Sequence, residues 1–519
     1  MPAKRRKRSN PVYVALCFTG VFVHTFQFLQ ASHSQTTSTL TSMTEKNSPV
    51  SAGRPNKIQF PPSPAASTFQ GELSIGAGMT LPLVFHFSTA QGIIEGTMDS
   101  PGQNAFGIKF DKVDLSPEGK LTASLDKMSA RFEGQLDTSA QSLSGTWSQS
   151  GSSLPIKLSA VEKYVGPKRP QTRQPSFPYI SANVTFHHCD ITLAGTFTRP
   201  KNDKPNATVI LLQGSGPHDR DETIFNHKPF LVIADYLSRH GIAVLRYDKR
   251  GCDQSGGDYR SSTSQDFVSD GMAALRYLQS RSDVDKSKIG LIGHSEGGVL
   301  APAIASQTQD LNQAGASNAA PVAFIVLLAG SALPGDQILI SQIKALNKNA
   351  DSGADAEQAL HIARETYKIL KEEKDNTEAI KKIKAKRQRL KASEYESEEK
   401  LKKLGPVIDA SLADISGPWY RYFLSYDPRP TLSKVRCPIL AINGDKDMQV
   451  LVDENFAAIK SSLETGGNKD FELKKIAGVN HLFQKSQTGM PAEYATIEET
   501  ISPDVLSLVC DWITKRTAK

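Results

Sequence analysis

The chain has 519 residues, of which 39% are hydrophobic, 22% charged and 7% aromatic. This composition is typical of a folded soluble protein, and it excludes a collagen-like, a low-complexity or a largely disordered chain. The formal net charge of +7 comes mainly from five basic residues at positions 4–8, without which 56 basic residues face 54 acidic ones. Charge therefore gives little support to a nucleic acid or another polyanion as partner, and we expect no nucleic-acid binding.

The N-terminal segment has the pattern of a secretory signal peptide. Its basic residues precede an apolar run over residues 12–23, and a stretch with three small residues, Ala-Ser-His-Ser, follows at positions 31–34. We therefore predict a signal peptide over residues 1–34 and export to the periplasm or the extracellular space. The alternative is an uncleaved membrane anchor, because the apolar character continues to Leu29. After signal removal we expect no stable membrane insertion.

The next stretches predict a linker and a small domain of strands. Residues 35–67 are rich in Ser, Thr and Pro, which is typical of a flexible linker. Over residues 68–162, short alternating runs separated by Gly, Pro and Asp predict an all-β domain, either a small barrel or a sandwich. No set of nucleophile, base and carboxylate is recognisable in this domain, and Phe132 and Trp147 are interpreted as core residues. A second linker, rich in Pro and basic residues, is predicted over 163–178.

Residues 179–519 alternate between apolar runs and amphipathic helical patterns. The runs ATVILLQ, GIAVLRYD, KIGLIGH, AFIVLLAG and CPILAINGD are almost continuously apolar. Such runs are typical of parallel strands whose two faces are both covered by helices. The segment 334–426 interrupts this alternation with polar, amphipathic helical sequence, between AFIVLLAG and CPILAINGD. We predict an α/β domain over 179–519 that carries a helical lid insertion over 334–426.

A G-x-S-x-G pattern at residues 293–297 predicts a nucleophilic serine, Ser295. The pattern directly follows the apolar strand KIGLI and precedes a sequence that can form a helix. A strand–turn–helix setting of this kind defines the nucleophile elbow, in which the serine occupies a sharp, strained turn. Small residues two positions before and after the serine are needed because larger side chains would clash in the turn.

A serine hydroxyl needs a base, and the base needs a group that orients it. Two strand-end loops further along the chain supply these groups: Asp447, with Asp445 as its competitor, follows PILAI, and His481 follows FELKKI. The oxyanion formed in the reaction needs backbone donors. We expect these to be the N–H groups of Glu296 and Ser215, although the glycine-rich segment around Ser215 could be a tight turn only.

Several segments resemble the α/β-hydrolase superfamily, in particular the serine aminopeptidase-like branch that includes secreted bacterial carboxylesterases. LLQGSGPHDRDE, AVLRYDKRG, LIGHSEGG, AINGDKDMQV and AGVNHLFQ occur in the order of that family, between residues 178 and 512. Members of this esterase group also carry an N-terminal β-domain with a DSPGQ-like turn, here residues 99–103. The resemblance implies an α/β-hydrolase fold and favours Asp447 over Asp445. One position departs from the pattern, because Asp253 stands where the family has glycine.

These observations predict a serine hydrolase that cleaves small-molecule carboxylic esters through an acyl-enzyme, with Ser295, His481 and Asp447 as its triad. No metal or organic cofactor is expected. An exopeptidase or amidase would use the same triad, and an acidic cluster at 219–222 could then hold a substrate's N-terminal amine or could simply brace its loop. A non-catalytic binding protein that works through its β-domain is the third hypothesis.

Two aromatic residues near the end of the insertion are candidates for substrate binding. Trp419 and Phe423 are four residues apart, so that in a helix they share a face. We expect them to line the acyl or alcohol pocket, because such pockets are mostly apolar. The alternative interpretation is that they dock the lid onto the core.

Overall fold

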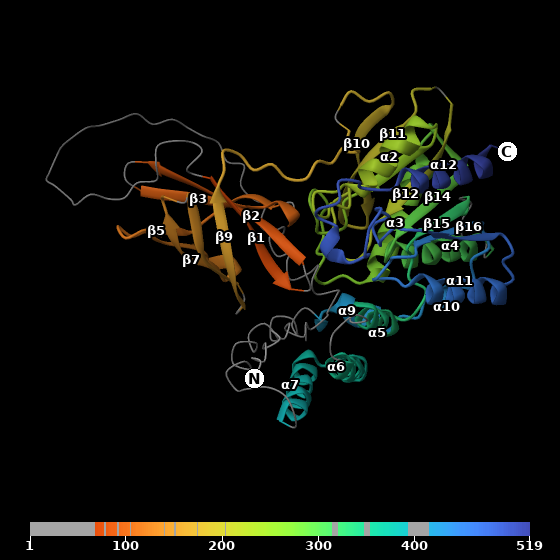
Figure 1. Ribbon diagram of the computed structural model, residues 1–519. Helices are drawn as coiled ribbons and strands as arrows, with labels where there is room; N and C mark the ends of the chain where they lie inside the picture. The colour runs from red at the N-terminus through yellow and green to blue at the C-terminus, as the bar shows by residue number, and fades with distance from the viewer. Residues whose placement is uncertain are drawn as a thin grey trace, which may run out of the picture. The chain divides into compact units, whose positions relative to one another are not determined.

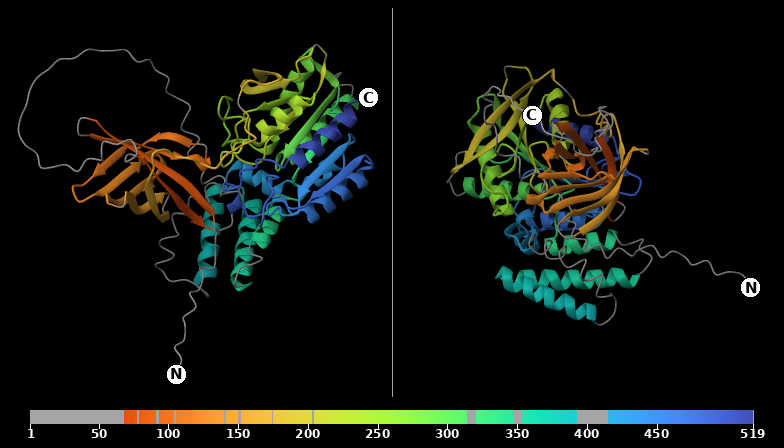
Figure 2. Two further views of the ribbon diagram at one scale, coloured as in Figure 1. Left: turned by 45° about the horizontal axis from the view of Figure 1, so that its top comes forward. Right: turned by 90° about the vertical axis from the view of Figure 1, so that its left-hand side faces the viewer.

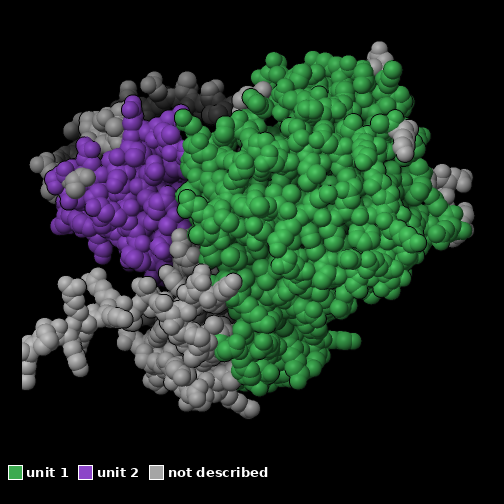
Figure 3. Space-filling view, turned by 45° about the vertical axis from the view of Figure 1, so that its right-hand side comes forward, with its two compact units in different colours: residues 1–25, 167–395, 411–519 green, residues 26–166, 396–410 purple. Residues whose placement is uncertain are grey.

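The computed structural model describes residues 68–518, apart from 77–78, 91–92, 104, 140, 150–151, 174, 203, 314–319, 347–352 and 393–414. The predicted signal peptide and the predicted linker over 35–67 lie outside the described residues. The described part of the chain forms two compact units, whose boundary in the sequence lies between Gly166 and Pro167. The first in chain order is purple in Figure 3, and the second in chain order is green.

The first unit is a single antiparallel sheet in the order β4-β3-β2-β1-β9-β8-β7-β6-β5 (Figure 1). Its strands are β1 (Thr68–Gly76), β2 (Met79–Ala90), β3 (Ile93–Ser100), β4 (Ala105–Lys109), β5 (Lys112–Leu115), β6 (Lys120–Leu125), β7 (Ala130–Asp137), β8 (Ser142–Gln149) and β9 (Ser152–Ala160). Strands β3 and β5, from opposite ends of the sheet, contact each other, so the sheet curls towards a barrel. The prediction of an all-β domain ahead of the second unit is confirmed.

An aromatic cluster fills the concave side of this sheet. Phe85 is completely buried and contacts the rings of Phe110 and Phe132 edge-on, with centroids 5.4 and 5.3 Å away. Trp147 lies 5.9 Å from the same ring. Phe132 and Trp147, 0% and 4% exposed, are core residues as the sequence predicts. Alternating strands of this kind bury every second side chain, which is why their sequences alternate.

The second unit contains an eight-stranded sheet in the order β10-β11-β13-β12-β14-β15-β16-β17. Its strands are β10 (Ile180–His188), β11 (Ile191–Arg199), β12 (Asn206–Leu212), β13 (Ala243–Tyr247), β14 (Val284–His294), β15 (Phe324–Leu328), β16 (Ile439–Gly444) and β17 (Phe471–Ile476). Strands β10 and β11 are antiparallel, and all pairs from β13 to β17 are parallel. The carboxyl ends of the six parallel strands therefore meet at one edge, where open α/β sheets carry their sites.

Helices cover both faces of this sheet (Figure 1). They are α2 (Pro229–Arg239), α3 (Ser264–Ser280), α4 (Gly297–Gln313), α10 (Arg429–Leu432), α11 (Val452–Gly466) and α12 (Pro503–Thr517). Helices α2 and α12 contact each other, as do α3 and α4, while α10 packs on both α4 and α11. Because both faces are covered, β12, β13, β15 and β16 are almost wholly buried, which explains their continuous apolar runs. The predicted fold class is confirmed.

The segment between β15 and β16 is helical. Its described helices are α5 (Gly335–Leu346), α6 (Gly353–Glu372), α7 (Asn376–Ala392) and α9 (Pro418–Ser425). Helix α6 packs against α5, α7 and α9, and α9 also contacts α3 of the main domain (Figure 2). The insertion begins after β15, at the same sheet edge as the predicted site residues.

Four cysteines fall among the described residues, and all four are unpaired. Cys189 is exposed, whereas Cys252, Cys437 and Cys510 are buried. Within the described part of the chain, no helix has the length and apolar character needed to cross a membrane.

Candidate active site

Ser295 occupies a sharp turn between β14 and α4. Its backbone φ of +53° lies in the left-handed region, which non-glycine residues adopt rarely. A Cβ atom at Gly293 would lie 2.0 Å from the carbonyl oxygen of Gly297, and one at Gly297 would lie 2.0 Å from that of Leu212. Neither position tolerates a side chain. The N–H of Ser295 donates to the carbonyl of Leu328 at 2.9 Å, which fixes the turn at the end of β15.

Asp447 and His481 contact each other on the loops that follow β16 and β17. His481 Nδ1 lies 2.8 Å from Asp447 Oδ2, and both side chains are almost completely buried. The second oxygen of Asp447 accepts two backbone N–H groups of its own loop. Asp445 instead accepts the N–H of Gly478 at 2.7 Å. The structure thus brings Asp447, and not its competitor, to the histidine.

His294, the residue before Ser295, connects the serine turn to the loop of His481. The two imidazole ring centroids are 4.9 Å apart, and His294 Nε2 lies 3.1 Å from the carbonyl oxygen of His481. On its other side, Nδ1 lies 3.0 Å from Glu222 Oε1. Because both ring nitrogens face oxygen acceptors, an imidazolium that pairs with the Glu222 carboxylate satisfies both contacts.

In this buried pair, the pKa of His294 is raised and the pKa of Glu222 is lowered. Burial opposes the charged form of His294, but the charge of Glu222 and the hydrogen bond to it outweigh burial and raise the pKa above 6.5. Burial likewise opposes ionisation of Glu222, yet His294, His218 and the N–H of Gly214 hold its pKa below 4.5. The pH window in which both groups are charged therefore extends below 4.5 and above 6.5.

Replacing Glu222 by glutamine is expected to lower stability in a pH-dependent way. A raised histidine pKa stabilises the fold below pH 6.5 and ceases to do so as the pH rises through the raised value. A lowered glutamate pKa stabilises it above pH 4.5 and ceases to do so as the pH falls through the lowered value. The loss, about 1–3 kcal/mol, should therefore be largest between pH 4.5 and 6.5. Thermal unfolding of both proteins from pH 4 to 9 measures it, and a constant difference from pH 5 to 9 would contradict the ionised pair.

The segment 214–216 lies beside the nucleophile. A Cβ atom at Gly214 would lie 3.2 Å from that of Ser295. The N–H of Gly214 already donates to Glu222 Oε1 at 2.5 Å and is not available to a substrate. Among the described residues, nothing accepts a hydrogen bond from the N–H of Ser215 or from that of Glu296. Both N–H groups are therefore available to donate to an oxyanion. That they form the oxyanion hole remains a prediction.

The acidic cluster after this segment is engaged within the protein. Asp219 accepts the N–H and the hydroxyl of Thr223 at 2.9 and 2.6 Å. Asp221 pairs with Lys228 at 3.2 Å and with Arg246. Together with the contacts of Glu222 described above, these bonds brace the loop, one of the two interpretations that the sequence left open.

Comparisons with known proteins agree with this architecture. The model of the prolyl oligopeptidase family matches residues 230–330. Esterase EstD of Thermotoga maritima is 27% identical over 338 residues, which cover 64% of this chain and 68% of EstD. A proline iminopeptidase of Saccharolobus solfataricus is 36% identical over 104 residues, 20% of this chain and 30% of that protein. The unit that follows Pro167 has the α/β-hydrolase fold.

Among solved structures, Est1E of Butyrivibrio proteoclasticus with bound ferulic acid aligns with 65% of the hydrolase and all of its own chain. It shares 17% sequence identity at a TM-score of 0.38. The esterase Pf2001 of Pyrococcus furiosus aligns with 68% of the hydrolase and 99% of its own chain, at 16% identity and a TM-score of 0.38.

The lid contacts the serine turn of the hydrolase directly. Trp419 of α9 is 7% exposed, and its Nε1–H donates to Glu296 Oε1 at 2.7 Å. Its ring stacks on that of Phe423, with centroids 5.3 Å apart and an interplanar angle of 5°. The two aromatic residues thus share a face of α9, next to the residue that follows Ser295.

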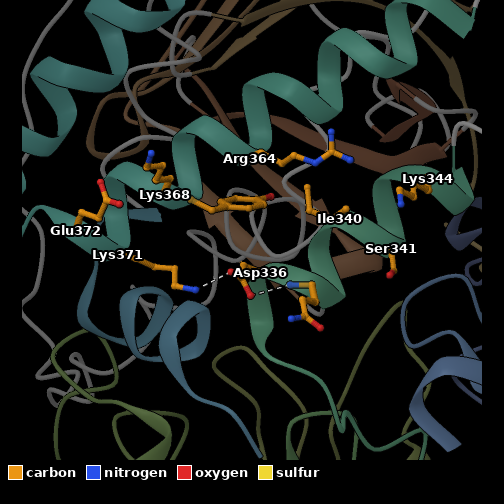
Figure 4. Close-up of a pocket in the computed structure, with 10 residues that line it drawn as sticks. Asp336, Ile340, Ser341, Lys344, Arg364, Lys368, Lys371 and Glu372 are labelled. Carbon is orange, nitrogen blue, oxygen red and sulfur yellow. Dashed lines mark hydrogen bonds and ion pairs between the residues drawn. The ribbon is translucent and has the colours of Figure 1, made fainter. Parts of the chain in front are cut away.

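A separate cavity lies within the lid, between α5 and α6 (Figure 4). Its volume is about 650 Å³. Asp336 pairs with Lys371 at 2.7 Å across one end, and Lys344, Arg364 and Lys368 add further positive charge. None of the predicted site residues lines this cavity, so it is not the pocket expected around Ser295.

The all-β unit contains a hydroxyl–imidazole–carboxylate chain that sequence analysis missed. His86 Nδ1 lies 3.2 Å from the hydroxyl of Thr68, and its Nε2 lies 2.8 Å from Asp99. Thr68 and His86 are direct partners across β1 and β2, and Asp99 lies on β3. Thr68 is 8% exposed in an extended strand rather than in a strained turn, so this chain lacks the exposed nucleophile of an elbow.

Proposed function

We propose that the hydrolase cleaves carboxylic esters of small molecules, with Ser295 as nucleophile, His481 as base and Asp447 as the group that orients it. The proposal rests on one observation above all. A buried carboxylate–imidazole pair with a 2.8 Å contact shares the sheet edge of a serine in a left-handed turn. This is the combination that nucleophilic catalysis by serine requires.

In the proposed reaction, the Nδ1–H of His481 donates to Asp447, which leaves Nε2 as the base. Nε2 takes the proton of Ser295 as its oxygen attacks the ester carbonyl, and the N–H groups of Ser215 and Glu296 hold the oxyanion. His481 then gives the proton to the departing alcohol, and an acyl-enzyme remains. Water, deprotonated by His481, attacks this acyl group. His481 then returns the proton to Ser295 Oγ as the bond from the acyl carbon to that oxygen breaks, and the carboxylic acid leaves.

The second candidate is an exopeptidase, which the 36% identity to a proline iminopeptidase over 104 residues favours. An exopeptidase that acts at the N-terminus would use free carboxylates to bind the substrate's terminal ammonium. The carboxylates that follow the oxyanion segment in the sequence are Asp219, Asp221 and Glu222, and all three are engaged within the protein. This supports an esterase over a peptidase that would use this cluster.

A direct comparison of substrates tests the proposal. The purified protein should hydrolyse p-nitrophenyl acetate and butyrate with a kcat/KM at least 10²-fold higher than that for alanine and proline p-nitroanilides, each with the Ser295→Ala variant as blank. Esters are intrinsically more reactive than anilides, so proline p-nitroanilide hydrolysis at a kcat/KM equal to or above the ester value would decide for the peptidase.

Trp419 and Phe423 are proposed to line the acyl or alcohol pocket, since α9 reaches the serine turn through Glu296. Trp419→Ala should then change the relative kcat/KM among p-nitrophenyl acetate, butyrate and octanoate by about 1–3 kcal/mol. Trp419→Phe, which keeps an aromatic ring but loses the indole N–H, is the matched control and should keep the chain-length preference. A uniform loss over all three esters together with a lower Tm would instead indicate that Trp419 only docks the lid.

We also propose that the protein is exported to the periplasm or the extracellular space, on the strength of its basic and apolar N-terminal residues. N-terminal sequencing of the protein from the exported fraction should begin near residue 35. An intact N-terminus in the membrane fraction would identify an uncleaved anchor, and an intact N-terminus in the soluble cytoplasmic fraction would contradict export.

A further inference from the structure

Lys249 is a buried cation at the centre of the candidate oxyanion site. It follows β13 and is 2% exposed. Its Nζ lies 2.6 Å from the carbonyl oxygen of Gly214, 3.2 Å from that of Gly216 and 3.1 Å from Glu296 Oε2. The same atom lies 4.4 Å from the ring centroid of Phe267. The three N–H donors of the ammonium thus meet three oxygen acceptors.

One of these acceptors belongs to the same peptide unit as the Ser215 N–H. The carbonyl of Gly214 and the N–H of Ser215 belong to one planar trans peptide unit, in which they point in opposite directions. Binding of the Gly214 carbonyl to Lys249 therefore sets the direction of the Ser215 N–H. The carbonyl of Gly216 is held on the other side of Ser215. A Gly-Ser-Gly segment has unusual backbone freedom, so it needs such restraint.

The third acceptor belongs to the residue that supplies the other donor. Glu296 is 6% exposed, and its Oε1 accepts the hydroxyl of Ser264 at 2.6 Å and the indole N–H of Trp419 at 2.7 Å. Its Oε2 accepts from Lys249. The single ammonium thereby joins the residue after the nucleophile to the segment that carries the opposite N–H.

We propose that Lys249 is the positioning residue of the oxyanion hole, which holds the N–H groups of Ser215 and Glu296 at a fixed separation beside Ser295. This inference rests on the proposed function and deepens it. Lys249 touches no reacting atom, so its effect is on the transition state only: removal should lower kcat and leave KM nearly unchanged.

The first test is Lys249→Met, with Arg250→Met as the matched control. Arg250 is the next residue, is buried to a similar extent and pairs with Asp270 at 2.6 Å, but has no bond to the oxyanion segment. With p-nitrophenyl butyrate, Lys249→Met should lower kcat by about 10²–10³-fold, as loss of an oxyanion donor does, with KM within about threefold. Its affinity for an alkyl trifluoromethyl ketone should fall in parallel. Arg250→Met should keep kcat within about threefold, and an equal loss in both variants would overturn the proposal.

A second variant separates orientation from charge compensation. Lys249→Met leaves Glu296 as a buried unpaired carboxylate, which could disturb the turn or prevent folding. The double variant Lys249→Met with Glu296→Gln removes both charges and should fold. If Lys249 orients the segment, the double variant stays about 10²-fold slower in kcat than Glu296→Gln alone. Recovery to the rate of Glu296→Gln would show that Lys249 only neutralises Glu296, and would overturn the proposal.

The outcome for Lys249 can be told apart from the outcome for the proposed function. If Ser295→Ala abolishes ester hydrolysis and Lys249→Met keeps the wild-type kcat, only the positioning role is wrong. If Ser295→Ala retains the wild-type rate, the proposed function itself is wrong, and with it the inference about Lys249.

Discussion

Replacing Ser295 by alanine is expected to lower kcat for p-nitrophenyl esters by about 10⁴-fold or more, while the protein stays folded. Removal of the nucleophile from a serine triad leaves only the small rate enhancement that substrate binding and the oxyanion donors provide. Alanine fits the left-handed turn no worse than serine, because neither has a branched Cβ. Steady-state kinetics and thermal unfolding of both proteins measure the effect.

The matched control is Thr68→Ala, which removes the hydroxyl of the other hydroxyl–imidazole–carboxylate chain, that of His86 and Asp99. Ester hydrolysis should be unchanged in this variant. Loss of activity in Thr68→Ala together with full activity in Ser295→Ala would contradict the assignment of Ser295 as nucleophile.

Replacing Asp447 by asparagine is expected to lower kcat by about 10⁴-fold. An amide at this position can donate to Nδ1 of His481 and so favours the tautomer in which Nε2 carries the proton and cannot act as base. Because the Asp447–His481 contact is buried, water does not readily replace the carboxylate. The kcat should stay low from pH 6 to 9, because the neutral imidazole of the variant carries its proton on the wrong nitrogen throughout this range.

Asp445→Asn is the control for this second prediction. Asp445 lies two residues away on the same loop and accepts the N–H of Gly478, with no contact to the imidazole. Its replacement should lower kcat less than tenfold. A larger loss in Asp445→Asn than in Asp447→Asn would reverse the assignment of the acid.

Features that depend on local sequence could be predicted well. The buried parallel strands appear as continuous apolar runs, and Ser295 stands out because its turn accepts only glycine at positions 293 and 297. The choice between Asp445 and Asp447 is different. Both follow the same strand, so spacing alone does not decide between them, and only the resemblance to known hydrolases favoured the correct contact.

Features that depend on tertiary contacts could not be predicted. Lys249 lies in AVLRYDKRG, one of the segments that resemble the family, but its bonding partners lie 33 to 47 residues away in the sequence. The Thr68–His86–Asp99 chain requires the register of three strands. Such contacts arise only when the fold brings distant residues together.

At two further positions the structure differs from what the local sequence suggests. Asp253, which replaces the glycine usual in the family, adopts a φ of +43° itself. Aspartate tolerates this region better than most residues do, so the turn persists. Arg169, within the segment predicted as a linker, donates to the carbonyls of Phe225, Ala495 and Ile497 at 2.8–2.9 Å. Its part of that segment is thus attached to the catalytic unit.

The most direct test of the central claim is covalent labelling of the nucleophile. A fluorophosphonate reacts with a serine only where a base and an oxyanion site activate it. We predict one adduct per chain, on the peptide that contains Ser295, and loss of ester hydrolysis in proportion to labelling. An adduct on another residue that accompanies the loss of activity, or full esterase activity in protein labelled at Ser295, would contradict the account.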